Sequence, residues 1–131
     1  MGALPRRRAD RVGSGRRAEL GRAGEKAAAD LLRARGYTIV GAGFLARRGE
    51  LDLVCRRGRE LVVVEVKTRS GDAFGTPLES VGARKRRALQ AAAAEYRALA
   101  EWRGPIRYAV VGVEPDLLGR LRAELIEDPF D

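Results

Sequence analysis

The spacing of hydrophobic and polar residues changes several times along the chain, and each spacing predicts a helix, a strand or a turn. Residues 17–35 (RAELGRAGEKAAADLLRAR) carry apolar side chains every three or four positions, which predicts a helix that Gly36 ends. Residues 37–40 form a short apolar run typical of a strand. The glycines of the following GAG segment predict a turn after this strand.

Two strands joined by a short polar link are predicted next. Residues 50–55 (ELDLVC) alternate, which places Glu50 and Asp52 on one face and the leucines on the other. Residues 60–67 (ELVVVEVK) are almost continuously apolar, as expected of a central strand buried on both sides. Because residues 57–59 are a short link, we expect the two strands to form an antiparallel hairpin.

The second half of the chain adds a helix and two strands. Residues 68–79 contain Gly, Pro, Ser and Asp and predict a loop, and residues 81–102 show the helical period. Residues 106–113 read as another buried strand, and residues 121–127 alternate weakly, as in an edge strand. The predicted fold class is therefore α/β, with one mixed sheet flanked by helices.

Composition divides the chain into a tail and one domain. Residues 1–16 hold five arginines without an apolar period, which predicts a mobile basic arm before a domain over residues 17–131. No apolar run approaches the roughly 20 residues of a membrane helix, so we expect no membrane partner. A single cysteine, Cys55, fits a reducing compartment and predicts a cytoplasmic protein. The net charge of +8 favours a polyanionic partner, above all nucleic acid.

Missing residue types exclude many kinds of active site. The chain has no histidine, which excludes Ser-His-Asp and Cys-His catalysis, HNH-type nucleases and histidine-bound zinc. One cysteine excludes cysteine-bound zinc and iron–sulfur clusters, and no GxxxxGK[ST] loop is present. Any catalysis must therefore depend on carboxylates, lysine, hydroxyls or a hard metal ion.

Charged side chains interrupt the two predicted central strands. Glu65 and Lys67 are two positions apart and share a face, and Asp52 of the partner strand can lie beside them. A buried unpaired carboxylate costs several kcal/mol, so either a salt bridge or a cation must compensate. Mg²⁺ or Mn²⁺ would take the two carboxylates, with the backbone carbonyl of Val66 as a further ligand. A metal-bound water near Lys67 would suit phosphodiester hydrolysis.

These residues resemble a known nuclease signature. Asp52, Glu65 and Lys67 are similar to the PD-(D/E)xK motif of the restriction-endonuclease-like superfamily, whose core is αβββαβ. The blocks GRAGEKAAADLLRARGYTIV, RRGELDLV and VVVEVKTR resemble the YraN family of bacteria, which is considered distantly related to archaeal Holliday-junction resolvases. The resemblance covers about residues 17–113.

The resemblance implies a role for each matching residue. Asp52 and Glu65 match metal-binding carboxylates, and Lys67 matches the catalytic lysine that positions the attacking water. Glu25 matches an additional acid that binds a metal or its waters, although a solvated helical glutamate would look the same. In one respect the sequence departs from the family, because Ala109 stands where an aspartate is often found.

Basic residues near the predicted site are candidates for binding nucleic acid. They flank the charged strands or lie at the start of the second helix, where amides already favour anions. These residues are Arg47, Arg48, Arg69, Arg84, Lys85, Arg86 and Arg87. With three Phe, three Tyr and one Trp, the chain has few side chains for stacking on bases, which favours recognition of the backbone.

Three hypotheses follow from the sequence. The first is a Mg²⁺- or Mn²⁺-dependent endonuclease for structured DNA, and the second is an inactive nucleic-acid-binding module of the same fold. The third is a basic interaction protein whose carboxylates form only ion pairs. A homodimer would be needed to cut two strands of a junction symmetrically.

Overall fold

The computed structural model describes residues 15–69 and 82–130, which form two helices and one five-stranded sheet. The helices are α1 (Gly15–Ala34) and α2 (Ala83–Ala100), and the strands are β1 (Thr38–Leu45), β2 (Glu50–Arg57), β3 (Glu60–Thr68), β4 (Ile106–Pro115) and β5 (Leu121–Glu127). The strand order is β1-β2-β3-β4-β5, with β3 and β4 parallel and the other neighbours antiparallel. This is the predicted α/β fold of the restriction-endonuclease-like kind.

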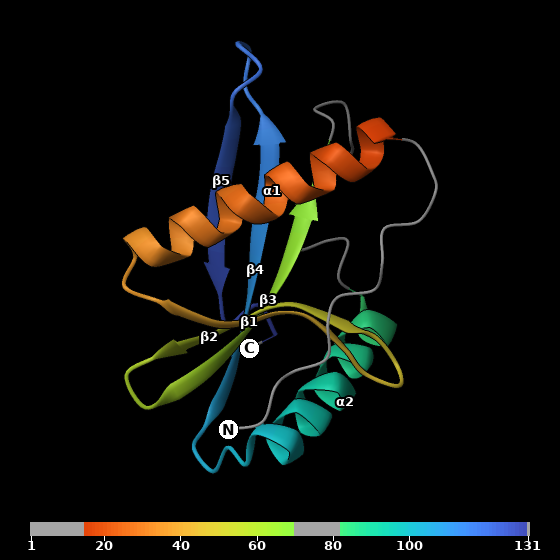
Figure 1. Cartoon of the computed structure of the whole chain (residues 1–131), viewed down its shortest axis with the longest axis vertical. Helices are drawn as coiled ribbons and strands as arrows, with labels where there is room; N and C mark the ends of the chain where they lie inside the picture. The colour runs from red at the N-terminus through yellow and green to blue at the C-terminus, as the bar shows by residue number, and fades with distance from the viewer. Residues whose placement is uncertain (1–14, 70–81, 131) are drawn as a thin grey trace.

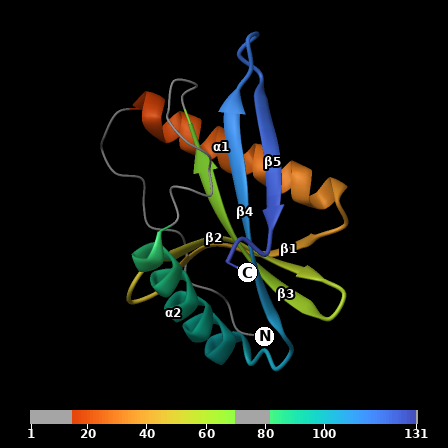
Figure 2. The same cartoon turned by 180° about the vertical axis from the view of Figure 1, so that it is seen from behind.

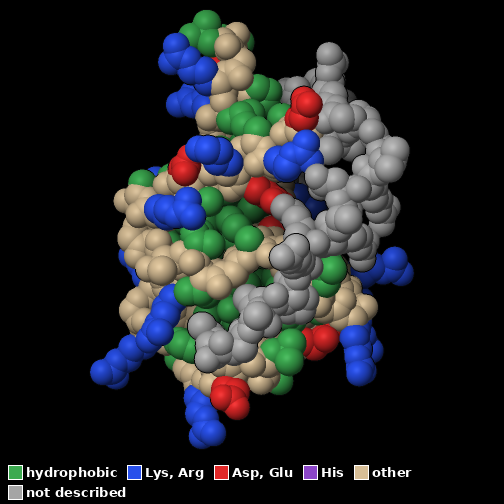
Figure 3. Space-filling model, viewed as in Figure 1, with side chains coloured by type: hydrophobic (Ala, Val, Ile, Leu, Met, Phe, Trp, Pro, Cys, Tyr) green, Lys and Arg blue, Asp and Glu red, His purple; other side chains and the backbone are tan. Residues whose placement is uncertain are grey.

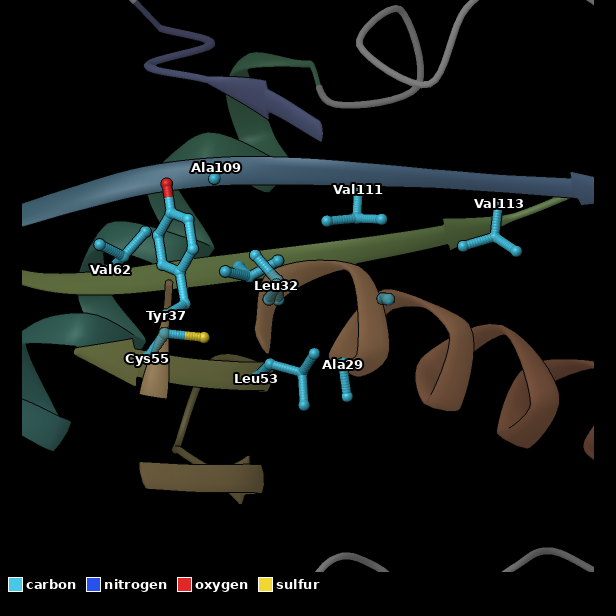
Figure 4. Packing of buried hydrophobic residues seen from close by; sticks show 11 residues of the cluster. Ala29, Leu32, Tyr37, Leu53, Cys55, Val62, Ala109, Val111 and Val113 are labelled. Atoms are coloured by element: carbon cyan, nitrogen blue, oxygen red, sulfur yellow. The ribbon is translucent and has the colours of Figure 1, made fainter. Parts of the chain in front are cut away.

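The two helices cover opposite faces of the twisted sheet, and each face has its own hydrophobic core (Figures 1 and 2). On the α1 side, Leu32 packs with Val64 and its neighbours, several of which are labelled in Figure 4. On the α2 side, Tyr96 packs with Val63. The valines of β3 alternate between these two cores, which confirms that β3 is a central strand buried on both sides.

The predicted turn at GAG is wrong, because residues 41–43 lie inside β1, which pairs with β2 as far as Leu45. The register shifts between Ile39 and Gly41, and Gly43 has a positive φ of 65°. Glycine signals a turn in a sequence, but it also permits a bulge within a strand. The pairing with β2 therefore continues through the glycines.

Several other boundaries move by a few residues. Helix α1 begins at Gly15, so the end of the predicted basic arm is helical, and the rest of that arm lies outside the described residues. Most of the predicted 68–79 loop also lies outside them. Helix α2 ends at Ala100 because Glu101 takes the left-handed conformation. Strand β5 has its predicted bounds and lies at the sheet edge. Neither described helix is long and apolar enough to cross a membrane.

Gly24 allows α1 to lie directly against the end of β3. A Cβ atom at this position would come within 2.0 Å of Thr68 Oγ1, whereas a Cβ at Gly21 would meet nothing within 4 Å. We expect Gly24→Ala to destabilise the fold by about 1–3 kcal/mol, as overpacking does. Gly21→Ala should be neutral or stabilising by up to about 1 kcal/mol, since alanine favours helix. Urea unfolding measures both, and Thr68→Ala should restore part of the stability that Gly24→Ala loses, since it removes the two nearest atoms. Equal stability of the two alanine variants would contradict this contact.

Candidate functional site

The candidate site lies where β2 separates from β3. The ladder between these strands ends at the pair Leu53 and Val64, and the earlier part of β2 pairs only with β1. The expected alternation of β2 fails at the same point, because Leu53 packs on the α1 side and Leu51 packs with Phe44 on the α2 side. After Val64, the edge of β3 that faces β2 therefore has no strand partner. The side chain of Asp52 takes the place of that partner.

Asp52 replaces the missing strand partner with its carboxyl group. Asp52 Oδ2 accepts a hydrogen bond from the Val66 amide at 2.8 Å. Burial and, after it, the neighbouring charge of Glu65 together raise the pKa of Asp52 to about 7, and the Val66 hydrogen bond opposes the shift. Two acidic groups are therefore held side by side, although the pairing of the hairpin has ended before Asp52, and their mutual repulsion favours a bound proton or cation.

Among the described residues, Glu65 is the one charged residue that is buried, with 3% of its surface exposed. It continues the α2-facing series of β3 after Leu61 and Val63. Its Oε2 atom lies 3.5 Å from Lys67 Nζ and 3.1 Å from Lys85 Nζ. Its Oε1 atom is buried without a hydrogen-bond partner. A buried acceptor without a partner is costly, so this oxygen marks a place where a ligand would compensate.

Lys85 makes a contact that the sequence did not indicate. It was predicted to bind nucleic acid from the start of α2, yet its ammonium group contacts Glu65 more closely than Lys67 does. The chain contains only three lysines among 26 basic residues, and two of the three surround this carboxylate. The scarcity of lysine was therefore a signal for the site, although only the structure brings α2 to β3.

The two other predicted metal ligands, Val66 and Glu25, differ in their placement. In an extended strand the N–H and C=O of one residue point to the same side, so the Val66 carbonyl faces the Asp52 side, as its amide does. Glu25 follows Gly24, which packs against Thr68 at the end of β3. No group of three or more acidic or cysteine side chains suited to a metal forms among the described residues, so Glu25 does not join Asp52 and Glu65 there.

The predicted basic residues separate into different surroundings. Arg48, Arg84 and Lys85 line a pocket of about 250 Å³ together with Glu50, beside the candidate site. Arg86 turns away and places its guanidinium over the ring of Phe130.

The remaining predicted basic residues, Arg47, Arg69 and Arg87, do not line this pocket, and two of them are known here by their backbone contacts. The Arg47 amide donates to Glu95 Oε2, the Arg69 amide donates to the Val113 carbonyl, and Arg87 is exposed. Among the described residues on the face shown in Figure 3, Lys and Arg side chains lie scattered. The pocket near Arg48 brings together three of the predicted basic residues, and Arg47 and Arg48 line a second, neighbouring pocket.

A second polar cluster lies at the other end of β2 and β3, around a pocket of about 370 Å³. Arg57 Nη1 lies 3.0 Å from Glu127 Oε1 and donates to the Tyr37 hydroxyl at 3.1 Å, and that hydroxyl also donates to Glu127. The charges of Arg57 and Glu127 compensate each other, and the contacts link β2 to β5. We therefore assign this cluster a structural role, which is to hold β2 and β5 together.

Ala109 lies in the α1-side core, paired with Val64 of β3 and 2% exposed (Figure 4). Glu65 lies in the α2-facing series of the same strand. The departure from the family's aspartate at this position therefore removes nothing from the Asp52–Glu65 pair.

Comparison with known sequences identifies the family. Residues 24–113 match the group described as "Uncharacterised protein family UPF0102". The chain belongs to this family. A UPF0102 protein of Symbiobacterium thermophilum is 48% identical over 112 residues, covering 85% of this chain and 95% of the relative. A UPF0102 protein of Thermodesulfovibrio yellowstonii is 37% identical over 114 residues, covering 87% and 97%. The UPF0102 match includes every residue of the candidate site, from Glu25 to Lys85.

Proposed function

We propose that the protein is a divalent-metal-dependent endonuclease that hydrolyses phosphodiester bonds in structured DNA. The observation that carries this proposal is the pairing of half-buried Asp52 with buried Glu65, whose Oε1 atom has no hydrogen-bond partner. A fold that serves only stability has no need to place two repelling carboxyl groups together away from solvent. A carboxyl group whose pKa is raised by burial and by a neighbouring charge, as that of Asp52 is, is typical of functional sites.

The residues present fit Mg²⁺ or Mn²⁺. Both are hard cations that prefer carboxylate and carbonyl oxygens, and one or two protein carboxylates suffice when phosphate and water complete the shell. Asp52, Glu65 and the Val66 carbonyl are the donors we assign, and Glu25 is a candidate for contact through water. When bound, the ion supplies Lewis-acid polarisation of a phosphate oxygen and of the attacking water.

The chain's own side chains then have separate tasks. Lys67 is 31% exposed and lies on the same face as Glu65, so its ammonium can reach both a water molecule and a phosphate oxygen. It would orient the water that attacks phosphorus, while one P–O ester bond breaks and the leaving oxygen takes up a proton. Arg48 and Arg84, in the pocket beside Glu50, would hold the DNA backbone in place. We place this work in the cytoplasm, and symmetrical cutting of a junction would require a homodimer.

One observation favours an inactive nucleic-acid-binding module as the second candidate function. Glu65 already has two ammonium groups within 3.5 Å, which compensate its charge without a metal. In such a module the carboxylates would fix the approach of α2 to the sheet, and the arginines alone would contact DNA or RNA.

Substitution of the carboxylates tests the proposal. Loss of an outer contact already costs a metal site about 10–100-fold, so Glu65→Gln and Asp52→Asn should reduce nicking by at least about 100-fold. Nicking is measured on duplex, branched and four-way-junction DNA with Mg²⁺ or Mn²⁺. Thermal melting should show stabilisation by Mn²⁺ in the wild type and none in Glu65→Gln.

Glu114→Gln, which changes an exposed acid of β4, is the matched control and should behave as wild type. Wild-type protein that binds these DNAs but nicks none of them would favour the inactive module. Full nicking activity in Glu65→Gln would overturn the assigned site.

A further inference from the structure

Lys85 occupies the boundary between the candidate active site and the basic pocket. Its Nζ lies 3.1 Å from Glu65 Oε2, and its side chain also lines the pocket formed by Arg48, Arg84 and Glu50. Its side chain is 40% exposed, whereas that of Glu65 is 4% exposed. The ammonium therefore has solvent and a basic pocket on one side and a buried carboxylate on the other.

The position of Lys85 on its helix is electrostatically unfavourable without Glu65. It lies in the first turn of α2, which contains no acidic residue and whose N-cap, Gly82, provides no side-chain hydrogen bond. The N-terminal end of a helix carries partial positive charge, so a cation there needs an anionic neighbour. Glu65 is that neighbour in this structure, and a DNA phosphate in the basic pocket would be an alternative one.

Glu65 has more cationic partners than a simple ion pair needs. Lys67 and Lys85 both approach Oε2, while Oε1 has no partner. A cation held by Glu65 and Asp52 would repel both ammonium groups. Both lysines have the same flexible four-carbon side chain, but Lys85 is the more exposed of the two and also lines the pocket beside Arg48 and Arg84, which Lys67 does not line. Lys85 is therefore the group that can leave.

We propose that Lys85 couples metal binding to DNA binding. This inference rests on the proposed function and adds a regulatory property to the same site. Without a metal, Lys85 neutralises Glu65 and is withheld from DNA. When Glu65 and Asp52 hold a divalent cation, the Lys85 ammonium moves to the pocket beside Arg48 and Arg84 and binds a backbone phosphate. Metal then strengthens DNA binding, and DNA strengthens metal binding by the same factor, as thermodynamic linkage requires.

The test measures both affinities in one set of variants. Mn²⁺ is the metal probe, and a four-way DNA junction is the nucleic acid, with ionic strength held constant and DNA integrity checked on gels. For the wild type we expect Mn²⁺ to tighten DNA binding by about tenfold, within the usual range of coupling between sites. In Lys85→Met the coupling should fall to about two- to threefold, the part that the ion's own contact with a phosphate oxygen supplies, and Mn²⁺ affinity without DNA should rise because a competing ammonium is gone.

Two further lysine variants separate coupling from general loss of charge. Lys26→Met removes a lysine that pairs with Asp30 on the exposed surface of α1, so it should keep the full wild-type coupling. Lys85→Arg keeps the charge and should restore part of the coupling that Lys85→Met loses. A purely structural role for Lys85 would change the melting temperature but leave the ratio of DNA affinities with and without Mn²⁺ unchanged.

The outcomes distinguish this inference from the proposed function. If Mn²⁺ binds to the wild type but not to Glu65→Gln, and Lys85→Met keeps tenfold coupling, the proposed metal site stands and the coupling role of Lys85 is overturned. If Mn²⁺ does not bind to the wild type at all, the metal-dependent function and the coupling are both overturned. Loss of coupling in Lys85→Met, with Lys26→Met unchanged, supports the inference.

Discussion

Lys67→Arg is expected to fold and to bind DNA like the wild type but to lose at least about 100-fold in cleavage rate, the usual contribution of a positioned acid–base group. The ammonium of Lys67 lies 3.5 Å from Glu65 Oε2 at a partly open position. A guanidinium is larger, planar and effectively always charged. It would preserve the ion pair with Glu65, but it would displace the water that the ammonium is proposed to orient. The measurement is the single-turnover nicking rate, with DNA affinity and melting temperature recorded for the same sample.

The sequence contains its own control for this substitution. Lys26→Arg makes the same chemical change at an exposed ion pair with Asp30 and should leave all three measurements unchanged. Lys67→Met removes the charge, but Lys85 still compensates Glu65 at 3.1 Å, so we expect little loss of stability and a full loss of cleavage. Wild-type cleavage by Lys67→Arg would show that the position requires only a positive charge, and would remove the catalytic role.

Much of the fold was predictable because its central strands are locally unambiguous. The run ELVVVEVK is apolar on both faces, and the observed β3 is buried on both faces. The GAG segment was misread because glycine has two structural uses, and nothing local distinguishes a turn from a bulge. Whether the segment forms a turn or a bulge is decided by the pairing of β1 with β2, which lies some ten positions further along the chain.

Only the part of the candidate site that lies within one strand was predictable, because alternation tells which side chains of that strand share a face. Two-residue periodicity places Glu65 and Lys67 on one face, as observed, whereas Asp52 reaches Glu65 at the point where β2 leaves the ladder and its alternation fails. The approach of α2 is a long-range contact that periodicity cannot specify, so Lys85 was grouped with its basic neighbours. Arg86 was grouped with them for the same reason, although it stacks on Phe130 near the chain's C-terminal end.

The pH dependence of stability should distinguish a site that awaits a cation from a simple network of ion pairs. Burial and the charge of Glu65 raise the pKa of Asp52 from 3.8 to about 7. Between these values the folded protein binds a proton at Asp52 that the unfolded chain does not, so this group's contribution to stability falls as pH rises from about 4 to 7. Asp52→Asn lacks this titration and can still accept the Val66 amide hydrogen bond. Relative to the wild type, the asparagine variant should gain on the order of 2–4 kcal/mol between pH 4 and pH 8.

The measurement is urea unfolding of both proteins at several pH values, because the difference between them cancels the other titrating groups. In the wild type, Mn²⁺ should stabilise more at pH 8 than at pH 5, since a cation must displace the proton of Asp52 at the lower pH. Asp52→Asn should lose most of that stabilisation at both pH values. If Lys67 and Lys85 instead held Asp52 as an ordinary ion-paired carboxylate, its pKa would be depressed and the wild type would gain stability relative to the variant as pH rises through the acidic range. That reversed slope would contradict the paired-carboxyl site and favour a purely structural role for the charges.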